Sequence, residues 1–372
     1  MSTAYFDNLA GVRGVAAAVV LVSHVVQIHF LRFIGLGTPL HQVSSFASEY
    51  AVVVFFILSG YLITYTLEAN IERNGRLRLD VFAAARFARL YPPLLYAIGV
   101  SLAVFLTMDF FALPGRSGPL SLPGDVYAAR EIVHLRLSEI GGALAMMQGM
   151  LEINGPLWSL YMEAKLYALY ACALALFTGR RSMLLAAVFV AVAWSGVKYN
   201  PGFAGYAAVW LTGALAYYIW NDSGRAGWHN RFLLCAGLIF AIIAAEGWRA
   251  LQDGGPPWIV ARDVLVAAAI AWILFRLRIR VPVGKRLADC SYSLYATHFP
   301  ILLLAQSLLL STGSRSLEAA VGAAILSTTA AALVALIGGG IEMKKSDVQV
   351  WLLASASRMR KIFVRRDSCK PL

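Results

Sequence analysis

Residues 9–25 read LAGVRGVAAAVVLVSHV, a stretch apolar enough to lie in a lipid bilayer. Runs of this kind, long enough to cross about 30 Å of hydrocarbon, recur along the 372-residue chain. The whole sequence is 59% hydrophobic and only 14% charged, a composition that soluble domains rarely have. The first run carries Arg13 and is followed by no small-residue cleavage site, so it predicts a retained span and not a signal peptide. We therefore expect an all-α, polytopic membrane helical bundle.

About ten apolar segments are predicted to span the membrane. They lie at about 9–30, 47–67, 91–113, 159–178, 183–198, 203–220, 232–247, 259–275, 291–312 and 319–342. If both termini are cytoplasmic, 22 of the 32 lysines and arginines fall in cytosolic segments, which is the positive-inside pattern. The net charge of +12 then reflects topology and attraction to the inner leaflet, so no nucleic acid partner is expected.

Two segments do not fit a simple series of spans. Residues 140–153 (IGGALAMMQGMLEI) are apolar but short and contain glycines, which predicts a re-entrant or interfacial helix on the outer face. Residues 343–372 are basic, and their stretch VQVWLLASASRMRKIFV is compatible with a helix in the inner interface. The expected organisation is a membrane-embedded domain over 1–342 followed by a basic cytosolic tail.

The opening stretch places two ionisable groups in apolar sequence, which costs free energy unless they are paired or solvated. Arg13 and His24 are eleven residues apart, so they share one helix face and lie about 16 Å apart along the helix axis. That distance spans much of the pantetheine arm of an acyl-CoA. The alternative is that Arg13 snorkels to the inner headgroups and His24 bonds a neighbouring helix.

Small and basic residues mark the next two stretches. In FFILSGYLIT the pair Ser59 and Gly60 interrupts a strongly apolar span, which often simply permits close helix packing. In RFARLYPPL the residues Arg86 and Arg89 would share one helix face and could fork a diphosphate, although a positive-inside loop explains them as well. The tandem prolines that follow are expected to mark the start of the next helix.

Two further spans are predicted to carry polar stripes. The stretch GPLWSLYMEAKLYALY places four polar residues on one helix face: Ser159, Glu163, Tyr167 and Tyr170. Trp158 precedes them at the expected outer interface, and Glu163 is either a capping group near the helix amino end or part of a site. The stretch SYSLYATHFP likewise aligns three residues, Ser291, Tyr295 and His298. A lone histidine on such a face is often a satisfied structural group.

Several common kinds of site are missing from the sequence. It contains no Walker loop, no nucleotide-fold glycine fingerprint, no GxSxG elbow and no metal-spaced His/Cys cluster, so no metal is expected. The four cysteines have no paired spacing, which argues against disulfides and thiolate metal sites. Any chemistry must therefore use intramembrane polar side chains and a carrier molecule.

Taken together, these stretches resemble the acyltransferase-three family of integral membrane O-acyltransferases. LAGVRGVAAAVVLVSH resembles the family's Arg-x10-His segment, and FFILSGYLIT resembles its Ser-Gly-aromatic span. RFARLYP resembles its Arg-x-x-Arg-x-Tyr-Pro loop, WSLYMEAKLY its Trp-Ser-Leu…Glu helix start, and CSYSLYATHFP its Ser-Tyr-x-Leu-Tyr…His-x-Pro segment. The five stretches follow the family's order over most of the chain.

The resemblance implies an enzyme of the bacterial inner (plasma) membrane with both termini cytoplasmic. It would transfer an acyl group, most often acetyl, from cytosolic acetyl-CoA or another acyl-CoA to a sugar hydroxyl. The acceptor would be a surface polysaccharide such as an exopolysaccharide or lipopolysaccharide, its lipid-linked precursor, or a glycolipid. The implied roles are catalysis by His24, Arg13 and Glu163, acyl-CoA binding by Arg86, Arg89, Ser59 and Tyr61, and acceptor binding by Trp158, Ser159, Tyr295 and His298.

His24 is the expected general base, because an imidazole with its unperturbed pKa of about 6.5 is mostly neutral at pH 7. An acyl-histidine intermediate is the alternative use of the same residue. A sugar transporter and a non-catalytic scaffold of a polysaccharide-export complex are the rival functions. A transporter would be expected to show paired repeats or broken helices, and the sequence shows none. A scaffold would have little reason to place Arg13 and His24 three turns apart on one face. Nothing in the sequence specifies an oligomeric state.

Overall fold

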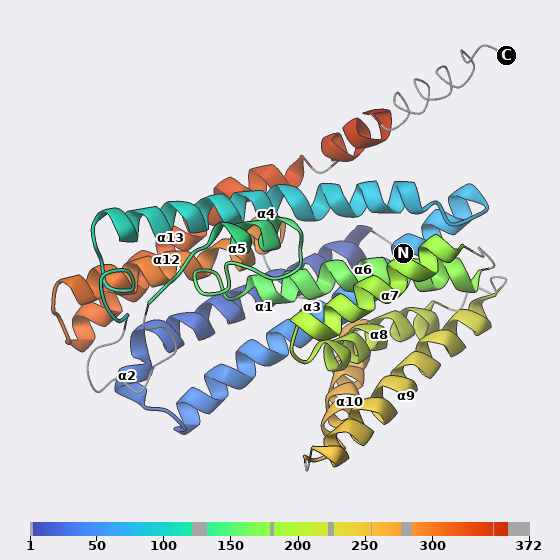
Figure 1. Cartoon of the computed structure of the whole chain (residues 1–372), viewed down its shortest axis with the longest axis horizontal. Coiled ribbons are helices and arrows are strands. Elements are labelled where there is room, and N and C mark those ends of the chain that lie inside the picture. Colours follow the sequence, from blue (N-terminus) through green and yellow to red (C-terminus); the bar gives the residue numbers. More distant parts are fainter. Residues whose placement is uncertain are drawn as a thin grey trace.

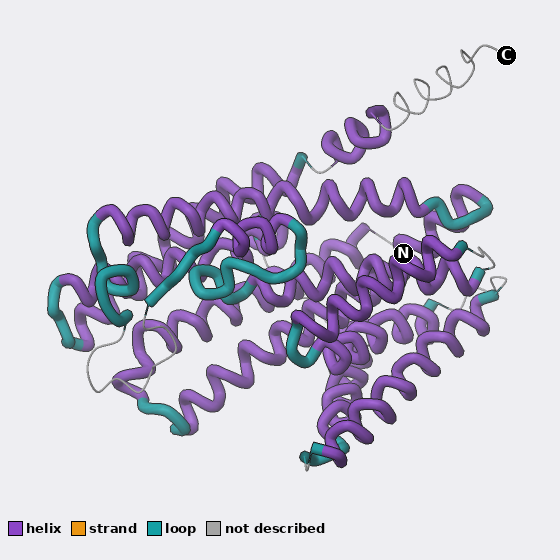
Figure 2. The backbone as a smooth tube through the Cα atoms, viewed as in Figure 1, coloured by secondary structure: helices purple, strands orange, loops and turns teal. Residues whose placement is uncertain are grey.

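The computed structural model shows a protein built from helices (Figure 2). The structure describes residues 3–120, 132–178, 182–221, 227–253, 255–276, 285–344 and 346–355. No strand occurs within these ranges. The all-α prediction is thus confirmed, and the chain is a polytopic membrane helical bundle.

The described helices fall into long and short elements. The long ones are α1 (Thr3–Val25), α3 (Pro39–Asn74), α4 (Leu79–Phe110), α6 (Leu157–Phe177), α7 (Met183–Tyr199), α8 (Phe203–Trp220), α9 (Trp228–Gln252), α10 (Ile259–Ala271), α12 (Ser291–Ser311) and α13 (Leu317–Met343). The short ones are α2 (Leu31–Ile34), α5 (Leu137–Leu144) and α11 (Lys285–Asp289), with π-helical turns at Val26–Phe30 and Trp272–Arg276. Each of the ten segments expected to span the membrane is therefore largely helical.

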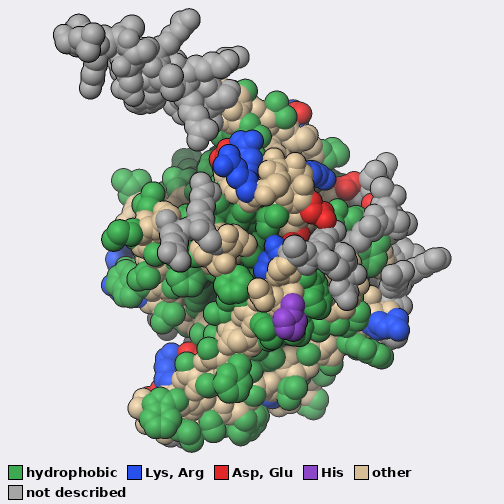
Figure 3. Space-filling view, turned by 90° about the vertical axis from the view of Figure 1, so that its right-hand side faces the viewer, with side chains coloured by type: hydrophobic (Ala, Val, Ile, Leu, Met, Phe, Trp, Pro, Cys, Tyr) green, Lys and Arg blue, Asp and Glu red, His purple; other side chains and the backbone are tan. Residues whose placement is uncertain are grey.

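Seven of the described helical segments are long and apolar enough to cross a membrane. They are Tyr5–Ile34, Pro39–Asn74, Leu79–Phe110, Leu157–Phe177, Trp228–Gln252, Ser291–Ser311 and Leu317–Met343. Large apolar side chains are exposed on their outer faces, as shown by Phe110 on α4 at 82% and Leu326 on α13 at 72%. In the end-on view of Figure 3, apolar side chains cover much of the surface and charged ones gather in a few clusters. The exposed apolar side chains on the outer helix faces suit contact with lipid.

The long helices run along the long axis of the bundle, with α9 and α10 branching away from it (Figure 1). Short connections join α1 and α2 to α3 and join α3 to α4, so consecutive helices run antiparallel. Both connections use a glycine with positive φ, Gly35 at 84° and Gly75 at 65°, a conformation that glycine adopts without steric cost. Helix α12 packs against α1, α4 and α13, which places it in the interior of the bundle.

Two glycines bring α3 and α8 into close contact. A Cβ atom on Gly60 would lie 2.0 Å from the Trp210 carbonyl oxygen, and one on Gly213 would lie 2.1 Å from the Ile57 carbonyl oxygen. The backbones can approach this closely only because both residues lack a side chain. Close packing is thus one role of the Ser59–Gly60 pair, and it fixes the α3 face that carries Ser59.

A proline in α12 anchors the irregular segment that precedes α6. Pro300 has no N–H, so the Ala296 carbonyl loses its helical hydrogen bond partner. Asn154 Nδ2 donates to that carbonyl oxygen at 2.8 Å and to Ser101 Oγ on α4 at 3.0 Å. Asn154 is fully buried, and its bonds hold the start of α6 against α12 and α4.

The expected start of the third span was wrong. Helix α4 begins at Leu79, and Pro92 and Pro93 lie inside it instead of marking its first turn. Prolines are tolerated within membrane helices where neighbouring groups satisfy the freed carbonyls. Arg86 and Arg89 are therefore on α4 itself and not in a loop that precedes it.

The two segments outside the series of spans have different outcomes. The short helix predicted near 140–153 exists as α5, but it ends at Leu144 and the chain continues without regular structure to α6. Residues 346–355 of the tail are helical, and the rest of the predicted interfacial stretch lies outside the described residues.

Candidate active site

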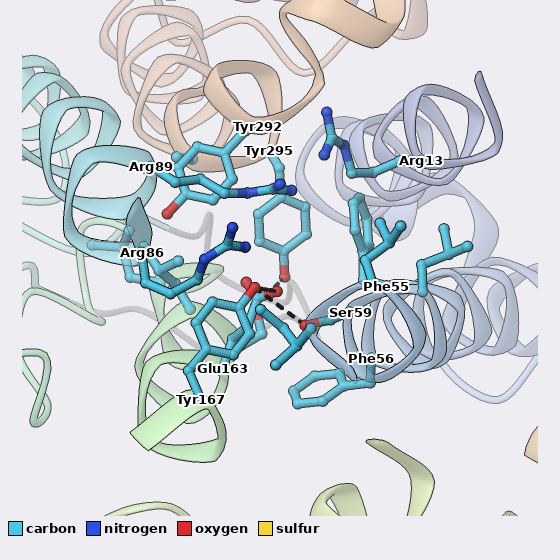
Figure 4. Close-up of a pocket in the computed structure, with 17 residues that line it drawn as sticks. Arg13, Phe55, Phe56, Ser59, Arg86, Arg89, Glu163, Tyr167, Tyr292 and Tyr295 are labelled. Atoms are coloured by element: carbon cyan, nitrogen blue, oxygen red, sulfur yellow. Dashed lines mark hydrogen bonds between the residues drawn. The ribbon is translucent and has the colours of Figure 1, made fainter. Parts of the chain in front are cut away.

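A narrow cavity of about 60 Å³ lies among α1, α3, α4, α6 and α12 (Figure 4). We call it the basic cavity. Its polar lining residues are Arg13, Ser59, Arg86, Arg89, Ser159, Glu163, Tyr167, Tyr292 and Tyr295. The remaining lining residues are mostly apolar and include Phe55 and Phe56. The structure thus brings together side chains from all five sequence stretches on a single cavity, and Arg13 is the contribution of the first stretch.

Arginine side chains dominate the electrostatics of the basic cavity. Arg13 is anchored, because its Nε donates to Ser291 Oγ at 3.0 Å and its Nη2 donates to the Ala288 carbonyl oxygen at 3.3 Å. Arg86 and Arg89 reach into the cavity from one face of α4 (Figure 4). The Nε of Arg86 is buried without a hydrogen bond partner. Three guanidinium groups facing a single lining carboxylate make this cavity suited to an anionic ligand.

The lining carboxylate belongs to Glu163, which ends a directed chain of hydrogen bonds. Trp210 Nε1 can only donate, and it donates to Ser59 Oγ at 3.1 Å. Ser59 Oγ then donates to the Tyr167 hydroxyl at 3.2 Å, and that hydroxyl donates to Glu163 Oε1. The chain holds the carboxylate in place at the cavity wall. Ser59 lines the basic cavity, and its hydroxyl is committed to this chain.

A second, wider cavity of about 400 Å³ lies beside the first. We call it the aromatic cavity, because Trp158, Tyr206, Tyr295 and Phe299 line it. Its polar lining residues are His24, Gln27, Ser45, Ser48 and Glu49. Trp158 packs against Tyr206 at a ring-centroid distance of 5.1 Å. Aromatic faces next to hydroxyl, amide and carboxylate groups form a surface suited to a polar ligand that also has apolar faces, as a sugar has.

Tyr295 and Ser159 lie at the boundary between the two cavities. Tyr295 lines both of them. Ser159 Oγ donates to the Pro156 carbonyl oxygen at 3.1 Å, so the Tyr295 hydroxyl is the donor in its 2.7 Å bond to Ser159. This pair forms part of the wall between the two spaces.

The two histidines singled out in the sequence contact each other. His24 Nδ1 and His298 Nε2 are 2.8 Å apart, and the two rings are nearly parallel, with their centroids 5.1 Å apart and an interplanar angle of 16°. His24 is half-buried and lines the aromatic cavity. His298 is fully buried, bonds the Leu294 carbonyl oxygen through Nδ1 at 2.9 Å, and is absent from the described lining of both cavities.

The cavities lie at different levels along α1. Arg13, near the middle of the helix, lines the basic cavity, whereas Val20 and His24 in its last turns and Gln27 in the turn that follows line the aromatic cavity. Residues near the start of the antiparallel helix α3, such as Glu49, also line the aromatic cavity. The shared helix face predicted for Arg13 and His24 therefore passes from one cavity to the other.

Tyr61 is the one predicted site residue from its stretch that lies outside both cavities. Its hydroxyl accepts from the Tyr5 hydroxyl at 3.1 Å and from Asn221 Nδ2 at 2.9 Å, and its ring stacks on Phe275 at 4.1 Å. Two residues along a helix rotate a side chain by about 200°, so Tyr61 points away from the face that carries Ser59. In the structure it packs between α3 and its neighbours.

Sequence reasoning missed several lining residues. Tyr167 was on the predicted polar stripe but had no assigned role, and Tyr292 adjoins a predicted face without belonging to it. Tyr206 and Glu49 on the aromatic cavity carried no sequence signal. Within the part of the chain that the structure describes, no group of three or more His, Cys, Asp or Glu side chains is placed to hold a metal ion.

Comparison with known proteins identifies the class to which this fold and site belong. Residues 6–339 match the acyltransferase domain family, so the chain belongs to the acyltransferase-three family. It is a membrane acyltransferase. The chain is also 30% identical over 195 residues to "Protein 2 in picA locus" of Rhizobium radiobacter, a match that covers 50% of this chain and 92% of that protein. No solved structure matches the chain.

Proposed function

We propose that the protein transfers an acyl group, most often acetyl, from acyl-CoA to a hydroxyl group of a sugar. The observation that carries this proposal is the meeting of the basic cavity and the aromatic cavity at Tyr295, with His24 on the adjoining wall. An anionic carrier and a neutral polar acceptor need different surroundings, and a transfer enzyme must bring both to one point.

The basic cavity is the proposed donor site. CoA carries a diphosphate, which Arg86 and Arg89 would bind from α4, because guanidinium groups form forked, charge-assisted hydrogen bonds with phosphate oxygens. The narrow space beyond them suits the linear pantetheine arm better than a ring. Arg13, held by Ser291 and Ala288, would bind the arm or an adjoining polar group.

The aromatic cavity is the proposed acceptor site. Its larger volume suits a sugar ring, and Trp158 and Tyr206 offer faces on which the apolar side of that ring packs. Gln27, Ser48 and Glu49 are positioned on the same cavity to bond hydroxyl groups. The acceptor we propose is a surface polysaccharide, its lipid-linked precursor or a glycolipid.

The reaction balances with one base. His24 takes the proton of the acceptor hydroxyl while its oxygen attacks the thioester carbonyl carbon; the C–O bond forms, the C–S bond breaks, and the proton passes to the leaving thiolate to give CoA–SH. The alternative use of His24 is as a nucleophile that carries the acyl group itself. In both routes the positive basic cavity would favour the negative charge that develops on the carbonyl oxygen.

The proposed location is the bacterial inner membrane, with both termini in the cytosol and acyl-CoA entering from that side. The positive-inside distribution of lysine and arginine supports this orientation.

Labelled acetyl-CoA tests the proposal. Protein purified into nanodiscs, incubated with labelled acetyl-CoA and a panel of neutral oligosaccharides or glycolipids, should release CoA thiol and label the acceptor. Comparing the mass of surface glycans from cells with and without the gene would identify the natural acceptor. Uptake of a sugar without thiol release and without any labelled product would contradict it and favour a transporter.

A further inference from the structure

We propose that His298 is a positioning residue: it holds His24 in the neutral form whose lone pair is on Nε2. This inference rests on the proposed role of His24 as the base, and it gives His298 a different task from the acceptor binding that the sequence implied. It follows from two hydrogen bonds, one between His298 and the Leu294 carbonyl oxygen and one between His298 and His24. If both imidazoles are neutral, these bonds allow only one arrangement of their N–H protons.

The first bond fixes the proton of His298. Its Nδ1 lies 2.9 Å from the Leu294 carbonyl oxygen, which can only accept, so Nδ1 carries the hydrogen. A neutral imidazole has one N–H, and Nε2 of His298 is therefore the acceptor. An imidazolium at this position would be fully buried, and no Asp or Glu among the described residues bonds His298.

The second bond fixes which nitrogen of His24 carries the proton. His298 Nε2 is an acceptor and lies 2.8 Å from His24 Nδ1, so His24 Nδ1 carries the hydrogen and donates it. The lone pair of the neutral His24 ring is then on Nε2. The bond to His298 and the edge contact at 5.1 Å with Phe299 keep the His24 ring from turning.

The arrangement supplies what a base needs. In many sites a second group bonds one nitrogen of a histidine and so decides which nitrogen acts. Here that second group is His298, which lies on the face of α12 that also carries Tyr295. His298 is not among the described lining residues of either cavity. When His24 Nε2 takes up a proton, the Nδ1–H bond to His298 also stabilises the resulting imidazolium.

Nitrogen NMR tests the proton arrangement directly. Full-length protein labelled with ¹⁵N on its six histidines, with the His24 and His298 signals assigned from single His→Gln variants, should show a protonated Nδ1 and an unprotonated Nε2 on His24. A scalar coupling across the bond between His24 Nδ1 and His298 Nε2 is also expected. A His24 ring protonated on Nε2 would overturn the inference even if the enzyme transfers acyl groups, whereas a wild-type protein without transfer would overturn the proposed function.

Two variants separate positioning from packing. His298→Gln keeps an acceptor oxygen near the place of Nε2, whereas His298→Leu keeps bulk without an acceptor. We expect His298→Leu to lower kcat at least tenfold with an unchanged KM for acyl-CoA, and His298→Gln to recover most of the loss. Equal kcat losses in both variants, or no loss in either, would overturn the positioning role.

Discussion

The basic cavity and the aromatic cavity differ in size, charge and exposure. The first is about 60 Å³, lies between buried helix faces and carries three arginines around one glutamate. The second is about 400 Å³ and carries aromatic side chains with His24 and the exposed Glu49. A narrow cationic space selects a slender anion, and a wide aromatic space selects a ring with hydroxyl groups. This difference is the reason why we propose separate cavities for donor and acceptor.

The cavities nevertheless share two helices. Along α1 the lining passes from Arg13 to His24, and along α12 it passes from Tyr292 through Tyr295 to Phe299. Bonds from Arg13 to Ser291 and between His24 and His298 join the two helices at both levels. This pair of helices would set the distance between the proposed carrier and the proposed base, and variants in each cavity should have separable effects.

The largest effect is expected from His24→Ala, which removes the base from the aromatic cavity. Transfer should fall by about 10²–10⁴-fold, the usual contribution of a positioned base, while acyl-CoA binding is retained because the basic cavity is intact. Turnover measured with saturating acyl-CoA, alongside binding of a non-hydrolysable analogue, checks both parts. His229→Ala, an exposed histidine on α9, is the matched control. Near-normal turnover of His24→Ala would remove the enzymatic role of this residue.

Charge reversal in the basic cavity should affect the donor alone. Arg86→Glu or Arg89→Glu is expected to raise the KM for acyl-CoA about 10- to 100-fold, because a charge-assisted hydrogen bond is worth about 1.5–3 kcal/mol. The KM for the acceptor should stay within about twofold. Arg73→Glu, an exposed arginine near the end of α3, is the control. An Arg86/Arg89 double alanine variant with unchanged CoA affinity would show that the phosphates bind elsewhere.

Glu163→Gln should lower kcat by about tenfold or more with acyl-CoA affinity retained. The amide of glutamine lacks the negative charge that accepts the hydrogen bond from the Tyr167 hydroxyl. Tyr167→Phe, which keeps the carboxylate but removes its donor, should cost less. Glu246→Gln on α9 serves as the control. Loss of acyl-CoA binding in Glu163→Gln would instead assign this carboxylate a structural role.

The smallest effect is expected from Trp158→Ala in the aromatic cavity. The KM for the acceptor should rise about 2- to 10-fold, since one aromatic face contributes about 0.5–1.5 kcal/mol beyond its buried area. The KM for acyl-CoA should not change. Trp194→Ala, 59% exposed on α7, is the comparison. An effect of Trp158→Ala on the donor but not on the acceptor would reverse the assignment of the two cavities.

Hydropathy and helix-face spacing predicted much of this arrangement. Apolar runs located the helices, and the spacing of Ser291, Tyr295 and His298 predicted one face of α12, which in the structure meets Arg13 and His24. The same rule could have excluded Tyr61, which is about 200° from Ser59.

Other features depended on tertiary contacts that no local pattern encodes. The start of α4 was misplaced because Arg86 and Arg89 look like loop residues and the prolines after them look like a first turn, whereas packing carries the helix through both. The bond between His24 and His298 joins residues 274 positions apart, and Tyr206 reaches Trp158 only through the packing of α8 against α3 and α6. These contacts decide which residues line the basic cavity and the aromatic cavity.

The proposed placement of donor and acceptor in cavities at different levels along α1 can be tested in sealed vesicles. Purified protein is reconstituted with a glycan acceptor trapped inside, labelled acyl-CoA is added outside only, and the trapped acceptor is recovered and analysed. The two-cavity arrangement predicts labelled acceptor inside the vesicles. The product would be formed by protein molecules whose Arg86 and Arg89 face the outside of the vesicle, and it should be absent with the His24→Ala variant. Labelled product that forms only when acyl-CoA and acceptor share one compartment would contradict it.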